Sequence, residues 1–398
     1  MTEDIRPGAA LVQRLQARFA RFATHEVPDD PLYVAIAEAV AARADWAAWL
    51  ADAPATQQLP NLWLAALQDR LLERVADGAR PPLADYYASA GGRRLPDAAF
   101  AAGLAGFVSA EEAALRERIA TRATQTNEIG RCAVLWPILR ALARRTGRTR
   151  MALLDVGCSA GLNLGVDRWR YRYVDDRSDA ALAVVDGAGT GVPEIACRVV
   201  RAAVGGGASP IVDGPAPEIV SRLGIDPIPI DVADAAAVRW LRACLWPHDT
   251  VRRERFDAAV AVAREQRWPV HAAADTLGAT RDWLHALPAD VTPVIFNSWV
   301  LAYFDPAALD EHVAQLKRWV VERGAVWISA EAPTLTRRWW PDMPDPPAPA
   351  PGGRVGVDEM AKTSTAWTVA SAGADGAVDW RFAARSHAHG RWLQWLAG

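Results

Sequence analysis

The segment from Met151 to Arg168 reads MALLDVGCSAGLNLGVDR and indicates the architecture of the C-terminal part of the chain. A short apolar run ends in Asp155, turns through small residues and glycines, and then resumes an apolar helical pattern. Glycines let a backbone turn tightly and approach a ligand closely, and a helix that begins after such a turn offers unpaired N–H donors. We therefore expect a strand, a ligand-binding turn and a helix here.

Strands and helices alternate on the C-terminal side of this stretch. Short β-rich runs include PIPIDVA, TPVIFNSWV and AVWISAE, and helical patterns such as PAALDEHVAQLKRWVVER separate them. This alternation predicts βαβ units and a mostly parallel sheet with helices on both faces, whereas the N-terminal part repeats apolar residues at helical spacing. We predict an α/β protein with an all-helical N-terminal region over residues 1–125. A Rossmann-like domain follows over 126–398, with a β-rich insertion at about 170–218.

Composition and charge exclude several classes of protein. The chain has 398 residues, 51% hydrophobic and 23% charged, and a formal net charge of −3, so no basic surface for nucleic acid is expected. Its four scattered cysteines predict neither a disulfide framework nor a zinc site. No apolar run reaches the roughly 20 residues of a membrane helix, and the N-terminus lacks a secretory leader. We expect a cytoplasmic protein that binds no membrane.

The glycine spacing of the turn distinguishes between kinds of nucleotide site. It lacks the G-x-G-x-x-G of a dinucleotide site and the G-K-[ST] of a P-loop. It resembles the first motif of class I S-adenosylmethionine methyltransferases, an apolar strand followed by Asp/Glu-x-Gly-x-Gly-x-Gly. The matching residues are Asp155, Gly157, Ser159 and Gly161, with serine in place of the middle glycine. The alternative is a strand-to-helix joint that binds nothing.

The methyltransferase resemblance implies further contacts to the cofactor. In that fold the second strand ends in an acidic residue that holds the ribose hydroxyls, and the next strand often ends in an acidic contact to the adenine amino group. Asp275 matches the adenine position. The open candidates for the ribose position are Asp226, Asp231 and Asp234, with Asp175 or Asp176 as a competitor nearer the turn. For each aspartate the alternative is a helix N-cap.

Polar residues also follow the predicted fourth and fifth strands. VIFNSWVLAYF places Asn297, Ser298 and Tyr303 where methyltransferases deliver catalytic residues, and an Asn or Ser at a strand's carboxyl end can orient a nucleophile. Glu331 ends the fifth strand and is a candidate general base or ligand of a substrate amine. The alternatives are a core aromatic for Tyr303 and a carboxylate paired with a nearby arginine for Glu331.

Several segments together resemble one bacterial family. TRATQTNEIGRCAVLWPIL, LLDVGCSAGLNLGVDRWRYRY and the terminal HAHGRWLQWL are similar to domain-of-unknown-function family 2332, nearly from end to end. The resemblance implies a methyltransferase-like domain behind a helical region, without a substrate. It directs attention to Thr126, Asn127 and Arg131, because the segment before the first methyltransferase motif can bind the methionine carboxylate, which an arginine grips bidentately. A capping box is the alternative.

The leading hypothesis is an S-adenosylmethionine-dependent methyltransferase that acts on a small-molecule acceptor. A second hypothesis keeps the Rossmann-like domain as a binder of a nucleoside or cofactor that does other chemistry, because fold does not fix function. A third is a non-enzymatic interaction protein. An NAD-dependent oxidoreductase ranks last because the glycine spacing does not suit a pyrophosphate. His387 and His389 lack an evident third ligand, so no metal is predicted.

Overall fold

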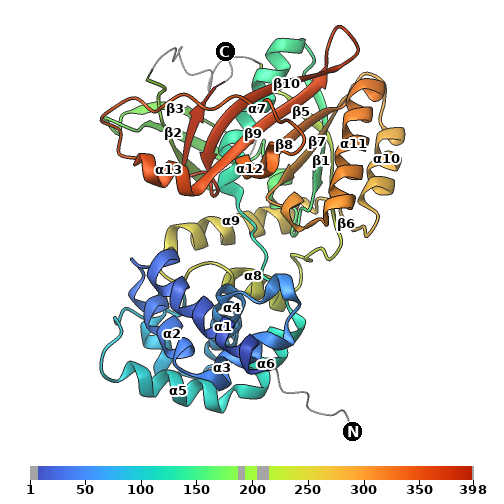
Figure 1. Ribbon diagram of the computed structural model, residues 1–398. Coiled ribbons are helices and arrows are strands. Elements are labelled where there is room, and N and C mark those ends of the chain that lie inside the picture. Colours follow the sequence, from blue (N-terminus) through green and yellow to red (C-terminus); the bar gives the residue numbers. More distant parts are fainter. Residues whose placement is uncertain (1–7, 187–192, 204–214, 397–398) are drawn as a thin grey trace. The chain divides into compact units, whose positions relative to one another are not determined.

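The computed structural model describes residues 8–186, 193–203 and 215–396 (Figure 1). The chain forms two compact units. Unit 1 comprises Met1–Thr126 and Ala233–Glu254, and unit 2 comprises Asn127–Val232 and Arg255–Gly398. Residues 233–254, predicted to belong to the second domain, are part of the helical unit 1. Parts of the expected insertion, residues 187–192 and 204–214, lie outside the described residues.

Unit 1 is helical and is built around stacked tryptophans. The indole rings of Trp46 and Trp49 stack on Trp63, and Trp240 from the later segment joins the same apolar core. Burial of these large side chains therefore draws residues 233–254 into unit 1. The helices are α1 (Ala9–Arg21), α2 (Pro31–Ala41), α3 (Ala44–Ala48), α4 (Pro60–Ala76), α5 (Phe100–Ala110), α6 (Glu112–Thr121), α8 (Ala235–Ala243) and the first residues of α9 (Thr250–Gln266).

Helix α4 also binds α8 through polar groups. Nε2 of Gln68 donates to the carbonyl oxygens of Ala243 at 3.0 Å and Leu245 at 2.7 Å. These carbonyls lie at the C-terminal end of α8, where a helix has no intrahelical donor left to offer them. Gln68 therefore supplies the C-terminal cap of a helix that follows it by more than 160 residues.

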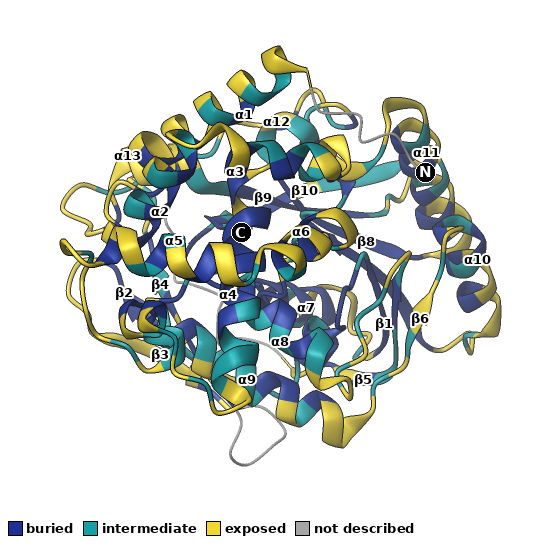
Figure 2. Ribbon diagram, turned by 90° about the horizontal axis from the view of Figure 1, so that it is seen from below, coloured by how far each residue is buried: buried dark blue, intermediate teal, exposed yellow. Residues whose placement is uncertain are grey.

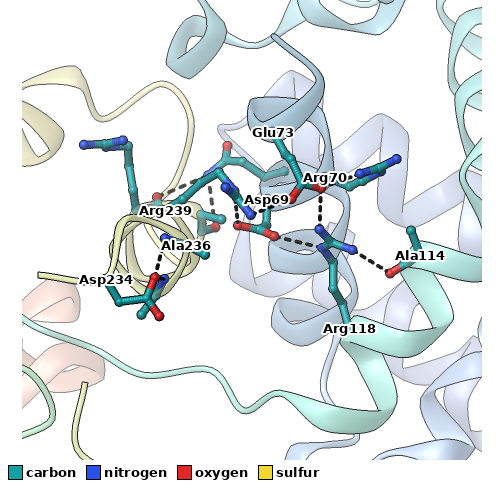
Figure 3. A network of polar contacts seen from close by, with 12 residues as sticks. Asp69, Arg70, Glu73, Ala114, Arg118, Asp234, Ala236 and Arg239 are labelled. Atoms are coloured by element: carbon teal, nitrogen blue, oxygen red, sulfur yellow. Dashed lines mark hydrogen bonds and ion pairs between the residues drawn. The ribbon is translucent and has the colours of Figure 1, made fainter. Parts of the chain in front are cut away.

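A buried ion cluster joins three helices of unit 1 (Figure 3). The carboxylate of Asp69 on α4 is completely buried and accepts from Nε of Arg118 on α6 at 2.8 Å and from Nε of Arg239 on α8 at 3.0 Å. Glu73, one turn further along α4, accepts from both guanidinium groups at 2.7 and 2.8 Å. Arg70 of α4 also pairs with Glu73. The carboxylates thus neutralise Arg118, which is buried and would otherwise be costly to hold there.

Unit 2 contains one large, mixed sheet. Its strands follow the order β3-β2-β4-β11-β10-β9-β8-β7-β1-β5-β6. Parallel pairing runs without interruption from β6 through β5, β1 and β7 to β8, and antiparallel pairing joins β8, β9, β10 and β11. The strands are β1 (Arg150–Val156), β2 (Arg170–Asp175), β3 (Ala181–Val185), β4 (Glu194–Val199), β5 (Glu218–Asp226), β6 (Val270–Ala272), β7 (Thr292–Ser298), β8 (Val326–Glu331), β9 (Ser364–Ala372), β10 (Val378–His387) and β11 (Trp392–Trp395).

The parallel strands are covered on both faces. Ala152 and Leu154 of β1 share one apolar core with Trp283 of α10 (Thr276–Ala286) and Leu316 of α11 (Pro306–Arg323), which lie side by side in Figure 1. Helix α7 (Cys132–Thr146) lies on the opposite face. Strands β8 and β9 are buried along nearly their whole length (Figure 2). Continuous apolar runs in the sequence therefore became strands buried on both faces. The remaining short helices are α12 (Pro333–Thr336) and α13 (Val357–Thr363).

The order of the parallel strands reverses at β1. After β1 the chain first forms β2, β3 and β4 at the far end of the sheet. It then returns to form β5 and β6 on one side of β1 and crosses to form β7 and β8 on the other. In open α/β sheets this reversal opens a crevice outside the carboxyl ends of the strands, where ligands bind. The rest of the sheet differs in plan. Strands β9 and β10 form a sequential antiparallel hairpin, β11 pairs in parallel with β4 and β4 in parallel with β2, and β3 pairs antiparallel with β2.

The prediction of a helix directly after the glycine turn is only partly met, because no α-helix forms there. The structure has only a 3₁₀ helix there, η7 (Leu162–Gly165), after which the chain proceeds to β2. The reason lies at Gly165, where an added Cβ would come within 2.4 Å of the indole rings of Trp169 and Trp268. Glycine is also a poor helix former. The indole rings of two tryptophans thus pack directly against the backbone at Gly165, and no α-helix forms from this apolar segment.

A proline inside α7 is compensated by β2. Pro137 has no N–H, so the carbonyl of Ala133, four residues earlier, loses its helical donor. The Oη of Tyr173 donates to this carbonyl at 2.8 Å, and Tyr173 is completely buried. The helix therefore stays continuous because a strand of the 170–218 region supplies the missing donor.

Removal of the Asp69 carboxylate should destabilise unit 1 strongly. We expect Asp69→Ala to lower the free energy of unfolding by about 3–5 kcal/mol, because it leaves the buried guanidinium group of Arg118 and the half-buried one of Arg239 short of a partner. The control is Asp52→Ala, which breaks the exposed 3.5 Å pair with Arg116 and should cost less than about 1 kcal/mol. Urea unfolding followed by far-ultraviolet circular dichroism measures both, and equal losses would contradict the assignment.

A double-mutant cycle tests the Tyr173 contact. Tyr173→Phe should cost about 1–3 kcal/mol because it leaves the buried Ala133 carbonyl without a donor. In a Pro137→Ala background the restored N–H can reach that carbonyl, so the same Tyr173→Phe change should cost well under half as much. Urea unfolding of the four proteins gives the coupling energy, and a coupling of zero would rule this compensation out.

Candidate functional site

The polar residues predicted from separate strands gather at one edge of the sheet. The glycine turn follows β1, Asp226 ends β5, Asn297 and Ser298 end β7, and Glu331 ends β8. These four strands are mutually parallel neighbours, so their carboxyl ends lie together at the reversal of strand order. This edge is the candidate site.

The turn after β1 has a left-handed backbone at three positions. The φ angles are 73° at Gly157, 52° at Ser159 and 68° at Gly161. An added Cβ at Gly157 would lie 2.3 Å from Cγ2 of Val300, and one at Gly161 would lie 2.6 Å from Cγ2 of Val270. Glycine is therefore needed at both positions for two reasons, the left-handed backbone conformation and the close packing. Ser159 takes the same backbone conformation although it has a side chain.

Two side chains hold the turn in this shape. Asp226 accepts from the backbone N–H of Ser159 and of Ile228, both at 2.9 Å, one at each carboxylate oxygen. Asn127 accepts from the N–H of Ala160 at 3.0 Å and donates to Oγ of Ser159 at 2.8 Å. Donors that the sequence analysis assigned to a ligand are thus engaged by the protein itself.

The sheet order resolves which aspartate lies beside the turn. Asp226 ends β5, the neighbour of β1, and so takes the position expected of the ribose-binding residue. Asp231 is exposed in the following loop, and Asp234 caps α8 in unit 1. Asp175 and Asp176 end β2, which six strands separate from β1, so this competitor is wrong.

Two other predicted cofactor residues have different surroundings. Asp275 is the N-cap of α10 and accepts from the N–H of Gly278 at 2.8 Å. This is the helix-cap alternative considered from the sequence. Thr126 is exposed and closes the first segment of unit 1. The structure gives neither residue a place in the cluster around the turn.

Asp155 is a buried acid at the end of β1. Its side chain is 2% exposed, and Oδ2 has no hydrogen-bond partner among the described residues. Burial raises its pKa to about 8, Arg131 opposes this rise and Asp226 adds to it. Arg131 is itself buried and donates from Nε to the carbonyl of Ala388 at 2.9 Å and from Nη1 to that of Ser298 at 3.4 Å.

Glu331 organises the chain that leaves β7. Its Oε1 accepts from Nδ2 of Asn297 at 2.9 Å and from the N–H groups of Val300 at 3.0 Å and Leu301 at 3.2 Å. Nε1 of Trp327 in turn donates to Oδ1 of Asn297 at 2.7 Å. Burial raises the pKa of Glu331, and the three donors oppose the rise. Through these contacts Glu331 holds the chain after β7, and among the described residues it forms no ion pair with Arg337 or Arg338, the alternative considered from the sequence.

The sheet separates the predicted catalytic residues. Asn297 is in register with Val156 and Ser329, so its side chain lies on the face that α10 and α11 cover, as does that of Glu331. Ser298, one residue on, points to the opposite face, which it shares with Asp155. Its Oγ is buried and has no partner among the described residues. Tyr303 lies on the 3₁₀ helix η8 (Leu301–Tyr303) and is 67% exposed.

One ion pair near the site escaped the sequence analysis. Glu128 is 2% exposed, accepts from the N–H of Gly130 at 2.8 Å and pairs with Nη2 of Arg255 at 2.7 Å. Its polar neighbours had marked the segment, but its partner lies 127 residues away. Gly130 packs so tightly that an added Cβ would lie 2.2 Å from the carbonyl oxygen of His389. Among the described residues no cluster of three metal-ligating side chains includes this histidine or any other.

The buried Asp155 predicts a specific pH dependence. Its pKa is about 8 in the folded protein and 3.8 in the reference state, so the folded protein holds a proton that the unfolded chain releases. The resulting stabilisation is complete below about pH 4 and is lost as the pH rises through about 8. Relative to Asp155→Asn, wild-type stability should therefore fall by up to about 1.4 kcal/mol per pH unit across this window.

Urea unfolding between about pH 5 and about pH 8 measures this difference. The control is Asp375→Asn, at the hairpin turn between β9 and β10, where the carboxylate is exposed and accepts from the N–H of Ala377. Its difference from wild type should stay flat. A flat difference for Asp155→Asn as well would show that Asp155 is ionised in the folded protein.

Comparison with known proteins identifies a family whose description names no activity. No curated protein and no solved structure matches the chain. Over the part of the chain that the structure describes, no helix combines the length and apolar character needed to cross a membrane. A family model described as "Uncharacterized protein conserved in bacteria (DUF2332)" matches residues 16–395, and the chain therefore belongs to this family.

Proposed function

We propose that unit 2 binds S-adenosylmethionine at the carboxyl edge of β1, β5 and β7 and transfers a methyl group to a small-molecule acceptor. The observation that carries the proposal is the position of the glycine turn and Asp226 on neighbouring strands at the reversal of strand order. That arrangement places a close-packed backbone turn beside a carboxylate, as the sequence motif predicts.

The unsatisfied polar atoms at this edge suit such a cofactor. Asp226 uses one acceptor site on each oxygen for backbone N–H groups, and a carboxylate has about four such sites, so capacity remains for ribose hydroxyls. Oδ2 of Asp155 and Oγ of Ser298 are buried without a partner on the same face of the sheet. Buried orphan groups of this kind are costly unless a ligand satisfies them.

S-adenosylmethionine, when bound, supplies an electrophilic methyl group. The protein's contribution is positioning, which is worth up to about 7–11 kcal/mol in favourable cases. Oγ of Ser298 is free to accept a hydrogen bond from an acceptor hydroxyl or amine. Asp155, whose pKa is raised to about 8 by burial, takes up a proton that the acceptor releases when its own carboxyl is ionised, and the ionised fraction grows as the pH rises toward 8. Asn297 and Glu331 hold the backbone that presents Ser298.

One observation favours the second hypothesis, a domain that binds a nucleoside without methyl transfer. The N–H groups of Ser159 and Ala160 already have partners, and only a 3₁₀ helix follows the turn. A ligand here gains little from backbone donors or from a helix dipole, so recognition falls to side chains. The catalytic assay, not the binding assay, distinguishes the two hypotheses.

Calorimetric titration with S-adenosylmethionine and S-adenosylhomocysteine is the first test. We expect dissociation constants on the order of 1–100 µM for the wild type. Asp226→Asn should weaken both at least tenfold, because one acceptor oxygen is lost and the turn loosens. Asp375→Asn, on the opposite edge of the sheet, should leave both unchanged. No heat and no thermal shift with either ligand would refute the proposal.

A second assay separates binding from turnover. The protein is incubated with methyl-labelled S-adenosylmethionine and a small-molecule extract of bacterial cells, and labelled products are resolved by chromatography. Methyl transfer predicts a product that Asp155→Asn reduces by at least tenfold without a matching loss of affinity for S-adenosylhomocysteine. Tight binding of both nucleosides with no labelled product would favour the second hypothesis.

A further inference from the structure

A cavity lies at the C-terminal end of α7, away from the candidate site. It has a volume of about 320 Å³, is open to solvent on one side and is lined by residues of α7 and of strands β9, β10 and β11. Ile138 and Leu142 of α7 and Val369 of β9 form apolar walls. Arg131, next to the candidate site, precedes Arg144 on the rim of the cavity by 13 residues (144 − 131), which corresponds to roughly 20 Å along a helix. The cavity is therefore a separate feature of unit 2.

Three arginines border this cavity with little negative charge to match them. Arg381 pairs with Asp379 at 3.2 Å. Arg145 donates to Oγ of Ser371 at 3.3 Å, and its pKa is lowered by burial and by the charge of Arg381. Arg144 makes no hydrogen bond or ion pair with any residue that the structure describes. The rim thus carries a net positive charge beside apolar walls.

The dipole of α7 offsets only part of the positive charge of the arginines at its C-terminal end. Cations at a helix C-terminus are stabilised by a dipole equivalent to roughly half a negative charge. Arg144 and Arg145 together carry two positive charges in the last turn of α7. Like charges close to an apolar wall repel one another, which disfavours the charged forms of the arginines. An anion bound in the cavity would offset this repulsion.

We propose that this cavity binds an organic anion with one carboxylate on a compact apolar body. The carboxylate is held by Arg144, Arg145 and Arg381, since guanidinium groups match carboxylates bidentately. The apolar body lies against Ile138 and Leu142. A volume of about 320 Å³ corresponds to roughly ten non-hydrogen atoms at the ~30 Å³ that each water occupies in the liquid. This inference does not rest on the proposed methyltransferase function.

Octanoate has the required size and charge and serves as the probe. Ligand-observed NMR and calorimetry on the full chain should give a dissociation constant of about 0.1–1 mM at low salt. The uncharged 1-octanol and the cationic octylamine have the same apolar body and should bind at least tenfold more weakly. Inorganic phosphate, which has charge but no apolar body, should also bind at least tenfold more weakly.

Matched variants locate the site. Arg144→Gln combined with Arg145→Gln should weaken octanoate at least tenfold. The control combines Arg148→Gln with Arg150→Gln, which removes the same net charge from two exposed residues outside the cavity and should change affinity less than twofold. Equal weakening in the two double variants would overturn the proposal, because it would mean that overall charge is responsible.

A cavity-filling variant provides an independent test. Ala141 lines the cavity on α7, and Ala141→Trp should abolish octanoate binding while all three arginines remain. Thermal melts establish that each variant is folded, and Ala141→Trp decides the question if the arginine variant is not. Octanol binding as tightly as octanoate, or octanoate binding unchanged in Ala141→Trp, would overturn the proposal.

Discussion

The burial of β1 between β5 and β7 is the constraint on which the rest of unit 2 depends. Six of its seven residues are buried, so every backbone N–H and C=O must pair with a neighbouring strand, and both faces must be covered. Helices α10 and α11 cover one face and α7 the other. A polar side chain can then be accommodated only at the carboxyl end, where the helices no longer seal the sheet. The candidate site lies at this end because polar side chains are excluded from the covered length of the strand.

Three buried carboxylates near this edge are stabilised in different ways. Glu128 is paired with Arg255, and Glu331 accepts three hydrogen bonds at one oxygen. Asp155 has neither arrangement, and burial raises its pKa to about 8. Oδ2 of Asp155 and Oε2 of Glu331 are both buried without a hydrogen-bond partner among the described residues, on opposite faces of the sheet. Perturbed and unsatisfied carboxylates of this kind concentrate at functional sites.

Local patterns in the sequence predicted the elements better than their surroundings. The apolar run ending at Asp155 and the left-handed glycines after it were readable because both depend on neighbouring residues. The absence of a helix after the turn was not, because it depends on Trp268 packing against Gly165 from a distant segment. The same holds for the engagement of Ser159 by Asp226 and for the pairing of Asp69 with Arg239, which is 170 residues away. Long-range packing and pairing decide these points, and no sequence window contains both partners.

The placement of Arg239 has a consequence for the order of events during synthesis. Residues 1–126 leave the ribosome with the Asp69 carboxylate in place but without one of its two arginines and without the helix that Gln68 caps. At 5–20 residues per second, Arg239 follows on the order of 10 s later. Meanwhile β1 and β5 have emerged, although β7 has not. The Asp69 carboxylate of the nascent N-terminal helices therefore remains without one of its arginines until a segment that follows β5 has been translated.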